Sequence, residues 1–469
     1  MRILPLRRSV FVLPVLLAVA MPWLVGEASA SEMSAQAAAA SHKPVFYDNN
    51  FDYLFDPCYC DWHLGDCFKR MTFTDCITVD VGGQYRARLM NELNHRGLGL
   101  TGVSDDFLLH RTRLYANAEI GPCFRAFAEY IDAESNYEDA PSRPIEVNRS
   151  DVLNLFGDVR LYGGPAGPVW ARLGRQEMLY GAQRLISPLD WANTRRTFEG
   201  YNVFWKGRKW AVDGFYTRPV LPDPTHFDSA DYDREFSGIW ATRKGCPHHA
   251  VDLFYLVYNN GDVGFKYDTL GGRWSGEHGN WTCEFEAAVQ FGTNDDASDH
   301  SAGFWVAGLG HKFPDMPWKP AVWVYYDWAS GTNDRGASHG YDHLFPLAHK
   351  YLGYMDLFGR RNIETPNVQV SFKPRDKIQV LFWYYYFFLE NRNDTPYSVL
   401  MTAYNPANAP ASAELGHEID FTVTYEIAPR ASLLFGYSHF FAGQYYQLTP
   451  GVAHRGDADF FYTQFQLNF

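Results

Sequence analysis

The chain has 469 residues and a formal net charge of −13 at pH 7, with 41 Lys and Arg against 54 Asp and Glu. This acidic balance excludes a strongly basic nucleic-acid-binding protein, so we expect no nucleic-acid partner. Aromatic residues make up 17% of the chain, yet the chain is polar on average. Aromatic girdles around a polar interior would produce this combination in a transmembrane β-barrel.

The N-terminus predicts export across a membrane. Three arginines within the first eight residues precede an apolar run that ends near Val25, and Ala28-Ser29-Ala30 has the small residues of a cleavage site. We therefore expect residues 1–30 to be a signal peptide. No later stretch of about 18 uncharged apolar residues exists in the sequence, so a mature chain that resides in a membrane must do so as a β-barrel.

Residues 31–75 are expected to form a separate periplasmic segment. An Ala/Ser-rich lead-in extends to about residue 45, and the part after it would be either a small cap or a plug for the pore. An exported chain meets an oxidising compartment, so we expect disulfides. Zinc is the weaker alternative, because the first four cysteines lack a C-x-x-C spacing, and with an odd number at least one thiol is free or pairs with another chain. The seven cysteines are Cys58, Cys60, Cys67, Cys76, Cys123, Cys246 and Cys283.

From residue 74 onward, strand-like segments alternate with turn signals. About 18 such segments lie within residues 76–469, and an even number of antiparallel strands closes a barrel with both termini on one side. The sequence therefore predicts an all-β fold, a transmembrane antiparallel β-barrel of the outer-membrane type. The expected strands are 76–93, 107–120, 123–133, 151–162, 168–178, 196–206, 209–218, 234–244, 249–258, 263–275, 280–292, 301–313, 319–330, 361–373, 377–389, 415–427, 431–442 and 458–469.

The connections between these strands fall into two alternating classes. Every second connection is a tight turn marked by Gly or Pro, such as Gly163-Gly164-Pro165 and Ala428-Pro429-Arg430. Short periplasmic turns that alternate with long extracellular loops are what a transmembrane barrel requires. The long polar links are 134–150, 179–195, 219–233, 331–360 and 390–414.

The last strand favours a barrel in the bacterial outer membrane. Within residues 460–469, Phe461, Phe465 and Phe469 line one face, whereas Gln464 and Gln466 line the other. The apolar face would meet lipid, and the strand would pair with the first one so that no edge remains. A closing strand that ends on Phe resembles the signal recognised by the barrel assembly machinery, so we expect this machinery and outer-membrane lipid as partners. The alternative is the final edge strand of a soluble β-protein.

The same alternation places arginines inside the barrel. Arg86 and Arg88 share the polar face of the first strand, opposite Tyr85 and Leu89, and four further strands repeat the pattern. A charge on the lipid face would cost about 2–4 kcal/mol at mid-membrane, so these side chains are expected to project into the lumen. The predicted pore-lining residues of the wall are Arg86, Arg88, Arg111, Arg113, Arg125, Arg160 and Arg172.

Two roles remain open for these arginines. They would form a cationic track that attracts an anionic solute, or they would pair with nearby acids and stiffen the wall, as Arg125 would with Glu129. Glu129 and Asp158 are the expected partners on the wall itself. Acids on the opposite arc are further candidates, namely Glu284, Glu286, Glu418, Asp420 and Glu426.

Two segments resemble a known family. Residues 172–200 read RLGRQEMLYGAQRLISPLDWANTRRTFEG, and residues 349–364 read HKYLGYMDLFGRRNIE. Both blocks closely resemble stretches of the alginate-export family of outer-membrane proteins. With the strand count, the resemblance covers roughly residues 74–469 and leaves the cysteine-rich segment unexplained.

The resemblance implies an Arg-lined barrel whose loops fold inward to constrict it. In the characterised members of the family the cargo is alginate, an anionic polyuronate. The implied function is therefore outward passage of such a polysaccharide. We expect the barrel to be a monomer, with periplasmic polysaccharide-export components as partners. Asp190 and Asp356 have a structural alternative, which we favour, in which each holds a neighbouring arginine. The implied loop-side constriction consists of Arg172, Gln176, Arg184, Asp190, Arg195 and Arg196, with Asp356, Arg360 and Arg361 opposite.

Two other functions compete with polymer export. A general or anion-selective porin for small solutes would use the same lumen without a polymer-specific gate. An enzyme is not expected, because the sequence has neither a G-x-S-x-G elbow nor an H-E-x-x-H motif. We also expect no cofactor and no metal site.

Overall fold

The structure is a computed structural model, and it describes residues 37–469 apart from 39, 58, 98 and 245–247. The predicted signal peptide and the start of the lead-in lie outside the described residues. Two of the seven cysteines, Cys58 and Cys246, do so as well.

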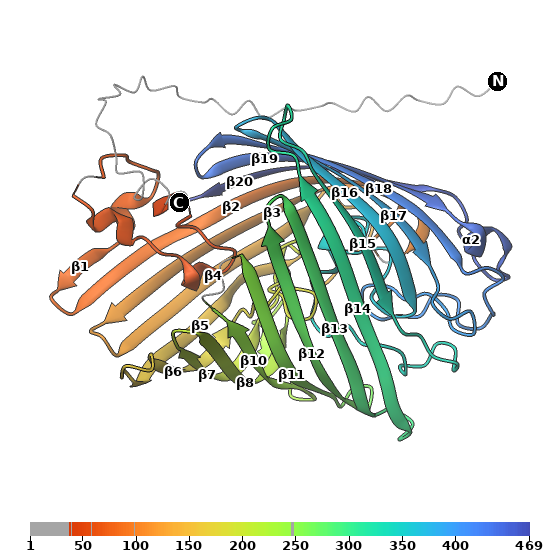
Figure 1. Ribbon diagram of the computed structural model, residues 1–469, viewed down its shortest axis with the longest axis horizontal. Helices are drawn as coiled ribbons and strands as arrows, with labels where there is room; N and C mark the ends of the chain where they lie inside the picture. The colour runs from red at the N-terminus through yellow and green to blue at the C-terminus, as the bar shows by residue number, and fades with distance from the viewer. Residues whose placement is uncertain (1–36, 39, 58, 98, 245–247) are drawn as a thin grey trace.

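Eighteen strands form a closed antiparallel β-barrel (Figure 1). Each strand pairs with the next barrel strand in the chain, and β20 (Ala458–Asn468) pairs with β2 (Ile77–His95) to close the wall. The predicted fold class is therefore confirmed, and each expected strand is present within three residues of its predicted bounds, except that β3 begins seven residues before its predicted start. The other barrel strands are β3 (Leu100–Ile120), β4 (Phe124–Asn136), β5 (Asn148–Tyr162), β6 (Val169–Gln176), β7 (Phe198–Lys206), β8 (Trp210–Leu221), β10 (Arg234–Arg243), β11 (His249–Asn260), β12 (Phe265–His278), β13 (Trp281–Thr293), β14 (Asp299–Lys312), β15 (Ala321–Ala329), β16 (Ile363–Arg375), β17 (Ile378–Phe388), β18 (Glu414–Ala428) and β19 (Ala431–Ala442).

Short elements complete the described chain. β1 (Met71–Thr74) pairs with the first residues of β2, beyond the point at which β20 ends, and so covers an edge that β20 leaves open. β9 (Ser229–Ala230) pairs with the end of β8. Among the residues described, no helix has both the length and the apolar character needed to cross a membrane. The helices are η1 (Phe46–Asp48), η2 (Asp52–Phe55), η3 (Asp66–Phe68), η4 (Ala348–Lys350) and α2 (Gln444–Leu448).

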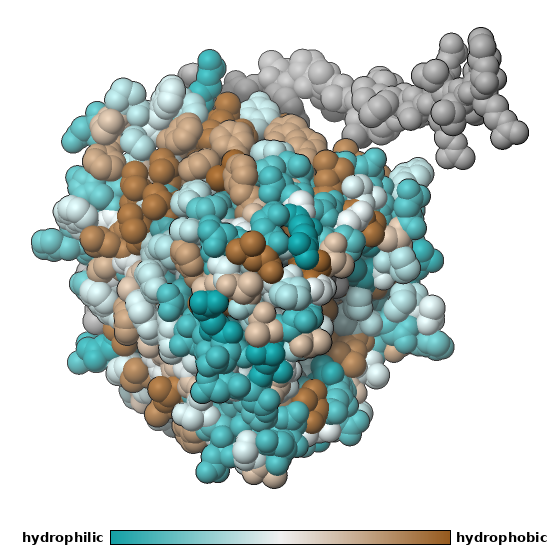
Figure 2. Space-filling view, turned by 90° about the vertical axis from the view of Figure 1, so that its right-hand side faces the viewer, coloured by the Kyte–Doolittle hydropathy of each residue, from teal (hydrophilic) through white to brown (hydrophobic). Residues whose placement is uncertain are grey.

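The two faces of the wall differ as the alternation predicts. In β3, Arg111 and Arg113 are fully buried, whereas Leu114 is 44% exposed on the outer face. In β20, Tyr462 is buried and Phe461 is exposed. Figure 2 views the molecule from the end at which α2 lies, where hydrophilic side chains cover much of the surface and apolar ones gather at the upper left.

The two ends of the barrel carry different connections. The described N-terminal segment and the C-terminus lie at the end with the short turns, and α2 lies at the opposite end with the long loops (Figure 1). The predicted alternation of short and long connections holds for most of the barrel, although the connections 261–264 and 294–298 at the long-loop end are themselves short. The turn at 245–247 lies outside the described residues.

Two long loops fold into the barrel and form part of its core. Leu185 and Ile186 belong to the β6–β7 loop (residues 177–197), and Phe345 and Phe358 belong to the β15–β16 loop (residues 330–362). All four are buried together with inward-facing aromatic residues of the wall. Ile186 and Phe345 also form a short parallel bridge, so the two loops meet inside the lumen.

The N-terminal segment enters the barrel from the short-turn end. Phe46 of η1 packs against Tyr115 of the inner wall, with ring centres 5.2 Å apart. Tyr47 lies edge-on to Phe127 and Phe156 at 5.9 and 5.1 Å. Phe46 and Tyr47 therefore lie against the inner wall of the barrel, while the role of the whole segment as plug or cap stays a prediction.

The disulfide prediction stays a prediction for the chain as a whole, because Cys58 and Cys246 lie outside the described residues. Cys67, Cys76, Cys123 and Cys283 form no disulfide in the part of the chain that the structure describes. For Cys123 and Cys283 the reason is topology, because they lie at different turns around the barrel circumference and each contacts a group of its own turn or neighbouring strand.

Candidate functional site

Arginines of the wall hold the β6–β7 loop inside the barrel. Arg86 donates from Nη1 to the Asp190 carbonyl (2.7 Å) and from Nη2 to the Ala192 carbonyl (2.9 Å). Arg88 Nη1 donates to the Trp191 carbonyl (2.8 Å). These carbonyls belong to irregular backbone and would otherwise need partners in the barrel interior. The first two predicted pore arginines therefore bind a loop.

Asp190 joins two of the predicted arginines. Its carboxylate pairs with Arg111 Nη2 at 2.9 Å and with Arg195 Nη1. Burial alone would raise the pKa of this carboxyl, but Arg195, Arg111 and Arg86 hold it well below its usual range. Asp190 is thus an ionised anchor between the wall and its own loop.

A second, fully buried network adjoins this anchor. Arg113 Nε donates to Glu129 (2.6 Å), and its Nη2 lies 3.2 Å from Glu177. Glu177 also pairs with Arg195 of the loop. The sequence interpretation missed Glu177, although it directly follows Gln176 in the first resemblance block. With its oxygens shared between two arginines, Glu177 ties the start of the loop to the wall.

Arg125 and Arg172 have a common acidic partner. Arg172 forms a two-point ion pair with Asp158, at 2.7 and 2.9 Å, and Arg125 lies 3.9 Å from the same carboxylate. The predicted pair between Arg125 and Glu129 is wrong. Residues four apart along one strand are separated by about 13 Å, whereas partners on neighbouring strands are about 5 Å apart.

Two further predicted residues make few contacts. Arg160 lies near the short-turn end of β5, where it is partly exposed and its Nη2 lies 3.5 Å from Cys123 Sγ. Gln176 is 1% exposed, and its Nε2 has no hydrogen-bond partner among the described residues. Arg160 therefore belongs to the rim of the barrel, while Gln176 is buried at the start of the loop.

Arg184 binds the same loop to the opposite wall of the barrel. Its Nη1 lies 3.0 Å from Glu284 and 2.9 Å from Glu286, and its Nη2 adds a second 3.0 Å bond to Glu284. Glu284 also accepts from Arg273 Nε at 2.8 Å. These two acids were expected to partner the arginines of the first strands. Their partner is instead a loop arginine, so the β6–β7 loop spans the lumen from β2 and β3 to β13.

The arginines expected opposite the loop have acidic partners on their own side. Arg360 forms a two-point ion pair with Asp327 of β15, at 3.0 and 2.7 Å. Arg361 lies 3.3 Å from Asp342 and donates to the Tyr341 carbonyl at 2.9 Å. Neither acid was predicted, although Asp327 could have been placed on the inner face of the strand expected at 319–330 by alternation alone. Both arginines thus fasten the β15–β16 loop to itself and to its own wall.

Asp356 does not hold an arginine in the described chain. Its carboxylate lies 3.0 Å from His349 Nδ1, so the predicted arginine-holding role is wrong. The physical reason is local, because the segment 349–356 folds back on itself and brings the imidazole nearer than any guanidinium. Burial lowers the pKa of His349, and Asp356 opposes that shift.

The acids of β18 do not pair with arginine in the described chain either. Glu418 accepts from the backbone N–H of Met355 (3.0 Å), and Asp420 accepts from that of Tyr354 (3.1 Å). Glu426 is exposed and has no ion pair among the described residues. The predicted partnership of these three acids with the arginine wall is therefore wrong, and two of them bind the backbone of the β15–β16 loop.

A stack of four side chains joins the two inward loops. The Arg88 guanidinium lies 3.8 Å from the Trp191 ring centre, and the Trp191 ring lies 3.5 Å from that of His349. Tyr354 continues the stack at 4.7 Å. Arg196 adds a bond between the loops, since its Nη1 donates to the Pro346 carbonyl at 3.1 Å. We call this group of side chains and loops the constriction.

Cavities lie on two sides of the constriction. A cavity of about 150 Å³ adjoins the stack and is lined by Arg88, Arg196 and Trp191, among others. A larger one of about 670 Å³ opens towards the short-turn end, and its lining includes Tyr47 and Arg172. The interior is therefore wider on the side of the N-terminal segment than beside the stack.

The N-terminal segment reaches the same arginines. Arg195 Nη2 donates to the Pro44 carbonyl (2.9 Å), and Arg125 Nη2 donates to the Tyr47 carbonyl (2.6 Å). The Arg113 guanidinium also lies 3.9 Å from the centre of the Phe46 ring. Residues 44–47 are thus bonded to the network that fixes the β6–β7 loop.

The chain was compared with known proteins and structures. The profile of the family described as alginate export matches residues 77–456. No curated protein matches the chain significantly. Similar solved structures include OccD3 (OpdP) of Pseudomonas aeruginosa, at 11% identity and a TM-score of 0.56 over 83% of this chain and 91% of that one. OccAB1 of Acinetobacter baumannii is 10% identical with a TM-score of 0.58, over 83% and 96% of the two chains. At these identities the likeness shows the fold, that of an outer-membrane porin-like barrel.

Proposed function

Because the chain belongs to the alginate export family, we propose that this outer-membrane channel passes an anionic polysaccharide, an alginate-like polyuronate, outward through the constriction. The barrel assembly machinery, outer-membrane lipid and periplasmic polysaccharide-export components are the partners that such a monomeric channel would need.

One observation supports an anionic cargo most directly. Arg86, Arg88 and Arg196 have no ion pair with an acid in the described chain, and neutral oxygens hold them instead. Arg88 Nη2 also donates to the Gln464 side-chain oxygen at 2.7 Å. A guanidinium that is held by neutral acceptors keeps its positive potential, and a low-dielectric wall focuses that potential on the lumen. The constriction thus combines fixed geometry with three guanidinium groups that form no direct ion pair in the described chain.

Passage through such a site needs no catalysis. A polyuronate carries one carboxylate on each sugar, and a guanidinium binds carboxylate through two parallel hydrogen bonds. Several weak sites in series allow a polymer to leave as well as to enter. The stack of Trp191 and His349 narrows the lumen beside Arg88, so the loops must separate to admit a sugar chain. Residues 44–47 would have to move with them, since they are bonded to Arg195 and Arg125.

Current block in planar bilayers tests the proposal. Oligouronates of increasing length, added to the short-turn side, should interrupt the current of the wild type for longer as the chain lengthens. Arg88→Gln should shorten these events, because it removes charge, whereas Arg88→Lys should retain most of the effect. Arg149→Gln is the matched control, since Arg149 is exposed and pairs only weakly with Glu134 at 3.7 Å. Equal blocking of the wild type and Arg88→Gln would contradict the proposal.

A porin for small solutes is the second candidate. The porin-like fold and the small cavity beside the constriction favour it. Liposome swelling separates the two functions. Rapid entry of neutral monosaccharides, unchanged in Arg86→Gln and Arg88→Gln, would favour the porin and exclude polyanion selectivity.

A further inference from the structure

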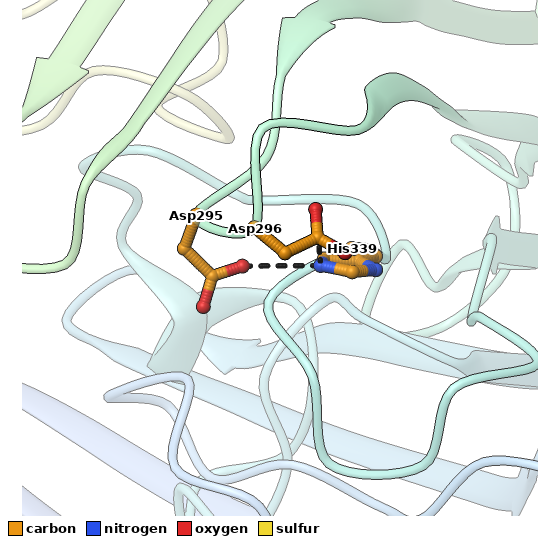
Figure 3. A group of neighbouring side chains, drawn as sticks. All are labelled: Asp295, Asp296 and His339. Carbon is orange, nitrogen blue, oxygen red and sulfur yellow. Dashed lines mark hydrogen bonds and ion pairs between the residues drawn. The ribbon is translucent and has the colours of Figure 1, made fainter.

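Three side chains of types that can bind a metal ion lie close together outside the constriction, at the long-loop end (Figure 3). Asp295 and Asp296 lie in the β13–β14 loop (residues 294–298), and His339 lies in the β15–β16 loop. One ligand atom from each residue lies within 4.8 Å of the other two. Figure 3 shows both aspartates pointing toward the same edge of the imidazole ring.

The spacing of these atoms suits a small divalent ion. His339 Nε2 lies 3.0 Å from an Asp295 oxygen and 3.7 Å from an Asp296 oxygen. Two ligands that each lie about 2.0–2.1 Å from a tetrahedral ion are about 3.4 Å apart. The two observed separations bracket this value, so rotations of exposed aspartate side chains would complete the geometry.

The other ring nitrogen of His339 faces a third acid. Nδ1 lies 3.9 Å from an Asp334 oxygen. In protein metal sites, the histidine nitrogen that does not bind the metal usually donates to a carboxylate, which fixes the orientation of the ring. The exposed Asp334 carboxylate would reach hydrogen-bond distance by moving about 1 Å, while Nε2 faces the two aspartates.

A single buried tyrosine positions both loops. The Tyr267 hydroxyl lies 3.0 Å from the Asn294 side-chain oxygen and 2.7 Å from the Ser338 carbonyl. Asn294 immediately precedes Asp295, and Ser338 immediately precedes His339. Anchoring through one wall residue keeps the ligands of the two loops in register, as a metal site requires.

The charge balance of this group is compatible with a bound cation. Three carboxylates surround one imidazole, and among the ion pairs of the described residues none joins Asp295, Asp296 or Asp334 to Lys or Arg. Even a protonated His339 leaves this group negative. Imidazole nitrogen with carboxylate oxygen suits first-row transition ions such as Zn²⁺, whereas Ca²⁺ and Mg²⁺ prefer oxygen ligands alone.

We propose that Asp295, Asp296 and His339 bind a divalent transition metal ion of the Zn²⁺ class, with Asp334 orienting the imidazole. The ion fastens the β15–β16 loop to the β13–β14 loop. Because the former loop continues from His339 to Tyr341 and into the constriction, the bound ion restrains the constriction from the outside. The site does not depend on which solute the channel carries.

Zinc titration of the purified mature protein in detergent tests the site. After removal of metal by a chelator, calorimetric titration with Zn²⁺ should show one strong site in the wild type. His339→Ala should weaken it at least about tenfold, and Asp334→Asn by up to about tenfold, as is typical of outer-shell partners. His226→Ala is the matched control, because His226 is 81% exposed and faces a single carboxylate, Asp223, at 3.4 Å. It should leave the strong site intact.

Two results would overturn the assignment. One is an unchanged Zn²⁺ isotherm in His339→Ala. The other is a site that prefers Ca²⁺ and survives the loss of the imidazole. Heat modifiability on gels reports whether each variant is a folded barrel, and Asp296→Asn provides a second ligand variant if His339→Ala does not fold.

Discussion

Replacing Arg184 by Met removes the guanidinium that holds the β6–β7 loop against β13 through ion pairs. The wild-type guanidinium is 1% exposed and makes three bonds of 2.9–3.0 Å to Glu284 and Glu286. Breaking a buried ion pair by removing one partner costs about 3–5 kcal/mol. Glu284 keeps Arg273 at 2.8 Å, so only Glu286 loses its ion pair and the lower end of this range applies. At 1.4 kcal/mol for each factor of ten, about 3 kcal/mol shifts the docking equilibrium of the loop more than 100-fold.

The assay is single-channel conductance in planar bilayers. Arg184→Met should give a larger and noisier conductance, because the loop leaves the far wall for much of the time. The double variant Arg184→Met/Glu286→Gln should restore most of the wild-type value, since it removes the unpaired buried charge. Arg218→Met is the control: its pair with Glu235 is half-exposed, and such pairs contribute about 0–1 kcal/mol. Wild-type conductance and noise in Arg184→Met would refute the assignment of Arg184 as the anchor.

Three further predictions concern the seam and the β15–β16 loop. Deletion of Phe469 removes two backbone hydrogen bonds to Gly83, of 2.8 and 3.0 Å. It should lower the yield of folded, heat-modifiable barrel on gels. An unchanged yield would show that the terminal residue is dispensable. Gly353→Ala should loosen the β15–β16 loop, because the φ angle of Gly353 is +88° and the new Cβ would lie 2.5 Å from the Glu418 carboxylate. The measurement is the rate of cleavage by added protease within residues 349–356, which should increase. Resistance equal to that of the wild type would contradict the prediction. Burial lowers the pKa of His349 from 6.5, so docking of this loop should be strongest above about pH 6.5 and weaken as the pH falls below it towards the lowered pKa. Conductance noise that rises on acidification in the wild type and not in His349→Phe would bear this out, and the opposite pH trend would not.

Much of the barrel could be predicted from local patterns. Side chains alternate across a strand, so the faces of Arg111, Leu114 and Tyr462 follow from position alone. Turn chemistry likewise marked the short connections at Gly163-Gly164-Pro165 and Ala428-Pro429-Arg430. These features depend on residues within a few positions of one another, and for that reason every expected strand is present.

The ion pairs could not be predicted in the same way. Alternation places Arg125 and Glu129 on one face but says nothing about the register between strands, and the actual partner, Asp158, lies on the neighbouring strand. Arg184 reaches acids about 100 positions further along the chain. Pairing of this kind depends on how the loops fold back, which no local spacing reveals.

The sequence by itself determined the barrel, the number of its strands, the inner and outer faces and the family to which the chain belongs. The barrel features follow from a two-residue period and from turn residues, which act over short distances, and the family follows from the segments 172–200 and 349–364. Only the tertiary structure decided what the inner arginines do. Arg86 and Arg88 bind the backbone of an inward loop because buried carbonyls need donors, and only the folded loops bring those carbonyls within reach.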